Sequence, residues 1–169
     1  MAESHARRAV ALRGREPGPA SVDLAADLAV LGATLAAQER YDEARTHLSR
    51  ALAICRAARP PRAYEIAVHV HNLAAIDQAT GRAQRAERRY RRALAIKEQR
   101  LGPDHPEIGL LLNNLGTLLH EQHRNAEAER CYQRAMTTAQ HGYRPGHPLP
   151  VTIRNNLAAV QRRTGSSRR

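Results

Sequence analysis

Histidine is the first residue type in this sequence that suggests chemistry. The chain holds nine histidines, and histidine is a common metal ligand and proton-transfer group. His69 and His71 lie two positions apart, so on a helix their side chains would diverge. His120 and His123 are three apart and could converge, but the sequence HEQH lacks the spacing of the HExxH zinc motif. We therefore expect no metal ion and no other cofactor.

Other catalytic arrangements are also missing from the sequence. It contains no Ser–His–Asp order, no phosphate-binding glycine loop and no nucleophile motif. Cys55 and Cys131 do not form a repeated pair, which favours a reduced, cytoplasmic protein over a disulfide framework. No apolar segment approaches the ~18 residues that a membrane span requires. We expect a protein that is not an enzyme and does not enter a membrane.

Asparagine offers a different kind of chemistry. The segments LLNNLGTLL (111–119) and IRNNLAAV (153–160) place adjacent asparagines among apolar residues. Asparagine is unfavourable inside a helix, because its amide competes with the backbone for hydrogen bonds. The same amide carries both a donor and an acceptor, which an extended peptide backbone can use. These pairs therefore point to peptide binding or to hydrogen bonds between helices.

The segments that carry the asparagines belong to a repeat. A leucine followed by glycine or alanine recurs every 42 residues, at Leu31, Leu73, Leu115 and Leu157. An alanine follows thirteen positions after three of these, at Ala44, Ala86 and Ala128. Prolines recur with the same period, at Pro61, Pro103 and Pro145. Self-similarity at a fixed period is the sequence signature of a repeat architecture.

Each repeat is predicted to form two helices joined by a short polar turn. First helices are predicted over 22–38, 65–79, 107–122 and 149–163, where leucines recur at helical spacing. Second helices are predicted over 42–57, 83–100 and 125–141, and a helix over 2–14 matches a second helix without its first. Phe and Trp are absent, so Ala, Leu, Ile and Val must fill the core. We predict an all-α solenoid of antiparallel helix pairs, with about eight helices.

These elements predict how the chain is divided. We expect a partial repeat at 1–20, repeats at 21–62, 63–104 and 105–146, a terminal helix at 147–163 and a disordered basic tail at 164–169. Because the series begins and ends within a repeat, its end helices would expose apolar surface. Two alternatives remain open. The polar end helices could act as caps. Otherwise, the chain could be a piece of a longer array or of a larger regulator, or it could self-associate through its ends.

The 42-residue unit resembles the tetratricopeptide repeat, in the long-loop form of kinesin light chains. The resemblance rests on the Leu-Gly/Ala pair, the alanine thirteen positions later, and the strings LGPDHPEI (101–108) and NNLG (113–116). It covers nearly the whole chain. It implies a right-handed superhelix in which first helices line a concave groove and second helices cover the convex side. It also implies a protein-binding module that serves as a scaffold, an adaptor or the docking part of a regulatory system.

The groove implied by this resemblance can be assigned to residues beside the buried leucines of each first helix. It would consist of Ala29, Ala33, Ala36, His71, Gln78, Asn113, Thr117, His120, Asn155 and Arg162. Asn113 and Asn155 would contact a partner peptide, and their neighbours would hydrogen-bond between repeats, namely Asn72, Asn114 and Asn156. The alternative is that all of these asparagines only join adjacent helices.

The net charge suggests a second surface. The formal charge is +11, which favours an acidic partner, although an arginine-rich composition typical of a high-GC genome would give the same charge. The second helix of the middle repeat would carry a row of arginines on one side, at Arg85, Arg88, Arg89 and Arg92. This row is either a solvated face or a surface for an acidic partner. Nucleic acid is the less favoured partner, because bases stack on aromatic rings and the chain lacks Phe and Trp.

Overall fold

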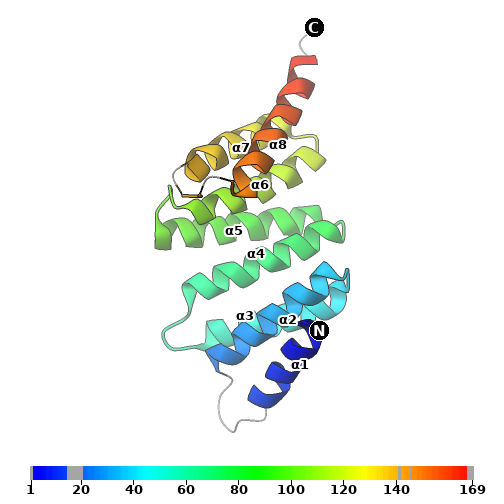
Figure 1. Ribbon diagram of the computed structural model, residues 1–169, viewed down its shortest axis with the longest axis vertical. Coiled ribbons are helices and arrows are strands. Elements are labelled where there is room, and N and C mark those ends of the chain that lie inside the picture. The colour runs from blue at the N-terminus through cyan, green and yellow to red at the C-terminus, as the bar shows by residue number, and fades with distance from the viewer. Residues whose placement is uncertain (1, 15–20, 141, 145, 167–169) are drawn as a thin grey trace. The chain divides into compact units, whose positions relative to one another are not determined.

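The computed structural model contains helices and turns, and no strand, in the residues that it describes: 2–14, 21–140, 142–144 and 146–166 (Figure 1). Eight helices lie within these ranges: α1 (Ala2–Arg13), α2 (Val22–Ala37), α3 (Tyr41–Ala57), α4 (Ala63–Ala79), α5 (Ala83–Leu101), α6 (Pro106–Glu121), α7 (Asn125–Gln140) and α8 (Pro148–Ser166). The predicted all-α fold is confirmed, and each predicted helix coincides with one of these.

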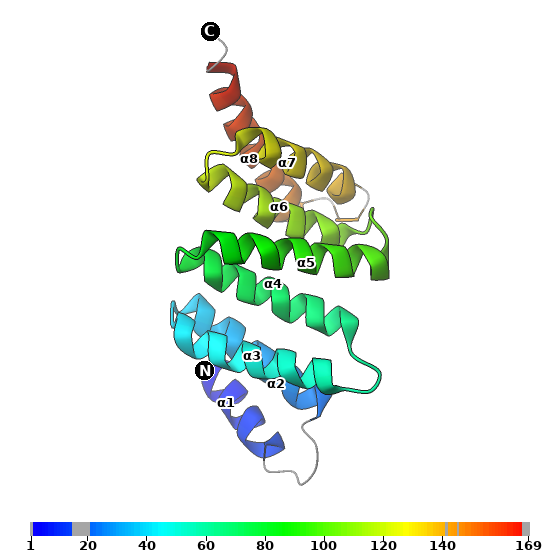
Figure 2. The same cartoon turned by 180° about the vertical axis from the view of Figure 1, so that it is seen from behind.

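The chain divides within α5 into two compact units, Met1–Arg89 and Tyr90–Arg169. In the first unit, α2 forms an antiparallel pair with α3, while α1 packs on α2 and α4 packs on α3 (Figure 1, Figure 2). In the second unit, α6 and α7 form the antiparallel pair, and α8 packs against both. Each unit therefore builds its core from helices that follow one another in the sequence.

Close approach within each helix pair depends on small residues at the repeated positions. The recurring alanines of the second helices, Ala44, Ala86 and Ala128, are completely buried. A Cβ atom at Gly32 would lie 2.7 Å from Leu48 Cγ, and one at Gly116 would lie 2.8 Å from Tyr132 Cε1. The glycine after the repeated leucine thus makes room for the large residue of the partner helix.

Hydrogen-bonding side chains mark the starts of three first helices. Ser21 Oγ accepts the N–H of Leu24 at 3.1 Å. Two loop histidines act in the same way: His105 Nδ1 accepts the N–H of Glu107 at 3.3 Å, and His147 Nδ1 accepts that of Leu149 at 3.2 Å. Two of the histidines therefore satisfy backbone groups that a helix start leaves unpaired.

The turns between first and second helices share one backbone conformation. Glu39, Gly81 and His123, spaced 42 residues apart, have φ values of 61°, 72° and 61°. The N–H of the next residue returns to a carbonyl five positions back, at 3.0, 2.7 and 2.9 Å for Arg40, Arg82 and Arg124. This is the left-handed helix ending that favours glycine. It places three arginines at equivalent backbone positions.

One helix is longer than predicted. Helix α8 continues to Ser166, so residues 164–166 are helical, although the sequence places them in a disordered basic tail. The residues 164–166 are Thr, Gly and Ser, and the helix continues through them because a single glycine lowers helix stability without ending a helix. Residues 167–169, and residues 1 and 15–20 of the partial repeat, lie outside the described part of the chain.

Candidate partner-binding faces

The facing sides of α2 and α4 form two hollows in the first unit. One hollow, of about 290 Å³, is lined by four alanines and one amide, together with three larger side chains: Ala33, Ala36, Ala75, Ala79, Asn72, Tyr41, Leu48 and Ile76. The other, of about 330 Å³, includes Ala26, Ala29, Tyr64 and His69 in its lining. Three predicted groove residues thus border hollows, namely Ala29, Ala33 and Ala36. His71 and Gln78 are half-buried and line neither of these two hollows.

The asparagines of the second unit join two first helices. Asn156 Nδ2 on α8 donates to Asn113 Oδ1 on α6 at 3.0 Å, and Asn113 Nδ2 donates to Asn114 Oδ1 at 3.4 Å. The Asn113 residue is only 7% exposed. Its predicted position on the groove surface is therefore wrong, because the amide of the following first helix covers it. Asn155 remains exposed on α8.

The first unit lacks the equivalent amide pair. Two repeats before Asn113 and Asn156, the matching positions are Ala29 and Asn72. Alanine has no acceptor for the Asn72 amide, and among the described residues the Asn72 side chain forms no hydrogen bond. Asn72, predicted as a residue between repeats, instead borders an alanine-lined hollow with its donor and acceptor unpaired. The missing partner was already visible in the sequence as alanine at position 29.

The remaining predicted groove residues of the second unit divide into two groups. Thr117 Oγ1 donates to the carbonyl of Asn113 at 3.0 Å and accepts from Tyr132 Oη at 3.1 Å. His120 Nδ1 lies 2.8 Å from Asn125 Oδ1, near the start of α7. These two side chains are engaged in bonds within the fold. Arg162, like Asn155, is exposed on α8.

A buried carboxylate binds two arginines of the predicted row. Asp77 on α4 is fully buried, and it accepts from Arg45 Nη1 at 2.9 Å, from Arg85 Nε at 2.8 Å and from Arg89 Nη1. Burial alone would raise the pKa of Asp77. The hydrogen bond from Arg85 and the charge of Arg89 outweigh it, so the pKa lies below its usual value.

Arg85 and Arg89 therefore bind within the fold and do not belong to a uniform solvated row. Arg88 and Arg92 are exposed. Asp77 was not among the predicted site residues, although the repeat contains a signal for it. The equivalent positions 35 and 119 hold leucines, so a carboxylate at 77 requires a basic partner.

A buried histidine and a buried thiol border the second hollow. His69 Nε2 lies 3.5 Å from Cys55 Sγ, and His69 is 3% exposed. Burial lowers the pKa of His69, partly opposed by Glu65, and burial raises the pKa of Cys55. The imidazole is therefore neutral and the thiol protonated near neutral pH, which excludes an activated thiolate here. His69 Nδ1 has no hydrogen-bond partner in the described structure.

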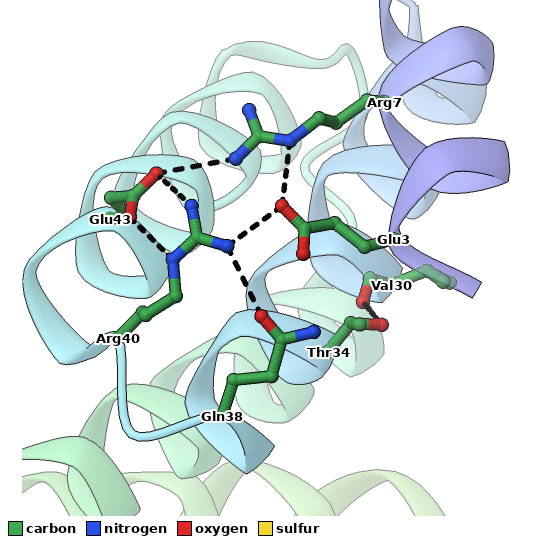
Figure 3. Close-up of polar contacts among 7 residues, drawn as sticks. All are labelled: Glu3, Arg7, Val30, Thr34, Gln38, Arg40 and Glu43. Carbon is green, nitrogen blue, oxygen red and sulfur yellow. Dashed lines mark hydrogen bonds and ion pairs between the residues drawn. The ribbon is translucent and has the colours of Figure 1, made fainter. Parts of the chain in front are cut away.

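Charged side chains also connect α1 to the α2–α3 pair (Figure 3). Arg40 forms two hydrogen bonds of 2.7 Å to Glu43, and it donates to Glu3 of α1 at 2.8 Å. Arg7 donates to Glu3 at 2.8 Å and to Glu43 at 3.3 Å. Hydrogen bonds from Arg7 and Arg40 lower the pKa of Glu3 to about 2. In the second unit, Arg124 binds Glu127 through the same two bonds of 2.7 Å.

A comparison with protein families decides the identity of the fold. The tetratricopeptide repeat model matches residues 1–57, 65–140 and 107–169. The chain belongs to the tetratricopeptide repeat family. The predicted resemblance is thereby confirmed, including its kinesin light chain-like character, which the solved structures below support.

Two solved structures resemble this chain over nearly all of its length. BtubC (BKLC) from P. vanneervenii has a TM-score of 0.84 at 24% identity, over 96% of this chain and 65% of its own. Nearly identical kinesin light chain TPR-like repeats from Podosopora anserina have a TM-score of 0.74 at 20% identity, over 97% of this chain and 78% of theirs. The predicted solenoid fold is confirmed. No relative was found among curated protein sequences.

The Sgt2 TPR domain from Aspergillus fumigatus is also similar, with a TM-score of 0.64 at 17% identity, over 85% of this chain and 81% of its own. Tetratricopeptide repeats serve in general as protein-interaction scaffolds, and this chain has their fold. Within the described ranges, no group of three or more His, Cys, Asp or Glu side chains could hold a metal ion. None of the described helices is both long enough and apolar enough to cross a membrane.

Proposed function

We propose that this tetratricopeptide repeat protein binds a peptide segment of a partner protein between α2 and α4. The unpaired amide of Asn72, at the edge of an alanine-lined hollow, is the observation that carries this proposal. The amide offers a donor and an acceptor to the peptide backbone, whatever the side chains of that peptide. The alanines leave room for a bulky aromatic side chain of the partner, such as Phe or Trp, which this chain lacks.

In the second unit, we assign the same role to the exposed side chains of Asn155 and Arg162 on α8. Asn113, Thr117 and His120 support this face from within the fold through the hydrogen bonds described above. The protein would act as a scaffold or as the docking part of a regulatory system, in the cytoplasm. We propose a protein as the partner, because an amide with one donor and one acceptor can bind a peptide backbone, while the apolar hollow beside it can hold a side chain of the same peptide.

A peptide selected from a random library on the immobilised protein provides a ligand for the test. Asn72→Ala should weaken its binding by roughly 3- to 10-fold, the range for one net hydrogen bond. Ala33→Leu should weaken binding further, because leucine fills the hollow. Ala37→Leu is the matched control, since Ala37 is exposed on the same helix and does not line the hollow.

A fourth variant tests the role of the unpaired amide directly. Ala29→Asn supplies the partner that Asn113 provides for Asn156, so it should pair the Asn72 amide and weaken peptide binding as Asn72→Ala does. Fluorescence anisotropy with the labelled peptide measures all four affinities. Equal losses in Ala33→Leu and Ala37→Leu, or an unchanged affinity in Asn72→Ala, would place the peptide elsewhere and refute the proposal.

A further inference from the structure

The arginine after each left-handed turn residue has an internal partner in two of the three repeats. Arg40 binds Glu43 through Nε and Nη2, with two hydrogen bonds of 2.7 Å. Arg124 binds Glu127 through the same atoms at the same distances. A planar guanidinium fits a carboxylate in this two-bond geometry. The chain thus shows twice which group is bound at this backbone position.

The middle repeat has the arginine but not the carboxylate. Arg82 is equivalent to Arg40 and Arg124, while position 85, equivalent to Glu43 and Glu127, holds an arginine. The position equivalent to Glu3 of the α1 network is also an arginine, Arg45. Two acidic positions are therefore basic here, and the internal partner of Arg82 is lost.

Buried Asp77 does not replace that partner. It accepts hydrogen bonds from Arg45, Arg85 and Arg89. In the described structure, the hydrogen bond between Arg82 and Asp77 joins backbone groups: the Arg82 N–H donates to the Asp77 carbonyl at 2.7 Å. Within the described part of the chain, the guanidinium groups of Arg82 and Arg88 form no hydrogen bond or ion pair. One carboxylate thus lies among several arginines, and the local charge is strongly positive.

A hollow lies beside these arginines at the start of α5. It has a volume of about 450 Å³ and is lined by Gly81, Arg82, Ala83, Gln84, Arg85 and Arg88. No carboxylate belongs to this lining. Gly81 leaves open space above the turn, since a Cβ atom there would meet no other atom within 4 Å. The hollow is accessible, and three guanidinium groups border it.

We propose that this hollow binds an aspartate or glutamate side chain of an acidic segment in a partner protein. Arg82 forms the two-bond contact with the incoming carboxylate that Arg40 forms with Glu43, and Arg88 adds a second positive charge. The site uses residues other than those of the α2–α4 hollows, so it stands independently of the peptide face proposed above. Of the predicted acidic-partner row, the site keeps Arg88, while Arg85 and Arg89 bind Asp77. It adds Arg82, which the predicted row did not contain.

The test uses two short peptides as probes, acetyl-Gly-Glu-Glu-Gly-amide and its glutamine counterpart. In spectra of the ¹⁵N-labelled protein at low salt, the Nε–Hε signal of Arg82 should shift with the acidic peptide and not with the glutamine peptide. The shift should approach the positions of the Arg40 and Arg124 signals, whose Nε groups already bind carboxylates. These two signals serve as internal references, because they report the expected contact in the same molecule.

Three variants separate the two-bond contact from net charge. Arg82→Ala should weaken binding of the acidic peptide by about tenfold. Arg82→Lys keeps the positive charge but lacks the planar group with two parallel donors, and it should weaken binding by about threefold. Arg50→Ala removes an exposed arginine of α3 and should change the affinity by less than about twofold. Thermal unfolding should be equal in Arg82→Ala and Arg50→Ala, because both side chains are exposed.

Several results would overturn the proposal. Equal weakening in Arg82→Ala and Arg50→Ala would mean non-specific attraction to a basic protein. An unchanged Arg82 signal would place the carboxylate elsewhere. An octathymidylate that displaces the acidic peptide and binds more tightly, with the same dependence on Arg82, would assign the hollow to nucleic acid.

Discussion

Asn156 on α8 donates a hydrogen bond of 3.0 Å to the side-chain oxygen of Asn113 on α6. Because Asn113 is buried, Asn156→Ala leaves a buried acceptor without its partner. We expect this substitution to lower the free energy of unfolding by about 1–3 kcal/mol. Asn155→Ala removes an exposed asparagine next to it and should change stability by less than about 0.5 kcal/mol. Urea unfolding followed by circular dichroism compares the two, and equal losses would contradict the structural role.

Asp77 and the three arginines that bind it, Arg45, Arg85 and Arg89, form a cluster that we call the Asp77 cluster. It predicts which of two substitutions at position 77 is the less destabilising. Asp77→Ala removes the acceptor of three arginines and leaves a small cavity, so it should lower the free energy of unfolding by about 2 kcal/mol. This loss is smaller than for a fully buried ion pair, because the three arginines are partly exposed to solvent. Asp77→Leu should be less destabilising, because leucine fills the same position in the other repeats, at Leu35 and Leu119. Thermal unfolding tests this order; a leucine variant less stable than the alanine variant would contradict it.

Buried His69 makes stability depend on pH in a defined direction. Its folded-state pKa is lowered by burial, so the unfolded chain binds a proton more readily than the folded protein does. The stability due to neutral His69 is present above the ordinary histidine pKa of about 6.5 and is lost as the pH falls toward the lowered value. His69→Asn should reduce the loss between pH 7 and pH 5. His123→Asn, at an exposed turn, should retain it. Urea midpoints measured at each pH provide the comparison.

The three left-handed turns predict opposite effects of glycine. Glu39→Gly and His123→Gly should each stabilise the protein by about 0.5–1 kcal/mol, because glycine adopts positive φ without a steric penalty. Gly81→Ala should destabilise it by about 1 kcal/mol for the same reason. Thermal unfolding of the three variants measures these signs, and a destabilised Glu39→Gly would show that the glutamate side chain matters more than the backbone.

The helices could be predicted because each repeat has small residues at the same positions, where two helices pack closely. Glycine or alanine after the repeated leucine, and alanine thirteen positions later, are sterically required where two helices approach closely. Four copies of the leucine with its small neighbour, and three of the later alanine, make an accidental match improbable. The ends of helices were less predictable, and α8 continues into the predicted tail, because helix ends depend on local caps and contacts more than on periodicity.

The roles of individual polar residues were harder to predict. Helical geometry places Asn113 and Asn114 about 100° apart, but it does not say which of them the next first helix will cover. The side chain of Asn156, 43 positions away, decides that Asn113 is buried. The Asp77 cluster was missed for a similar reason, since its three arginines come from α3 and α5 and meet only in the folded protein. Partners distant in sequence determine both outcomes.

The position three residues after each turn arginine differs between the repeats. It holds glutamate in two copies and arginine in one, while the alanines at the centre of each copy are the same and fully buried. In the middle repeat, the arginine at this position also binds buried Asp77. Arg85→Glu would therefore place an acceptor beside Arg82 and, at the same time, remove one of the positive charges that neutralise an interior carboxylate.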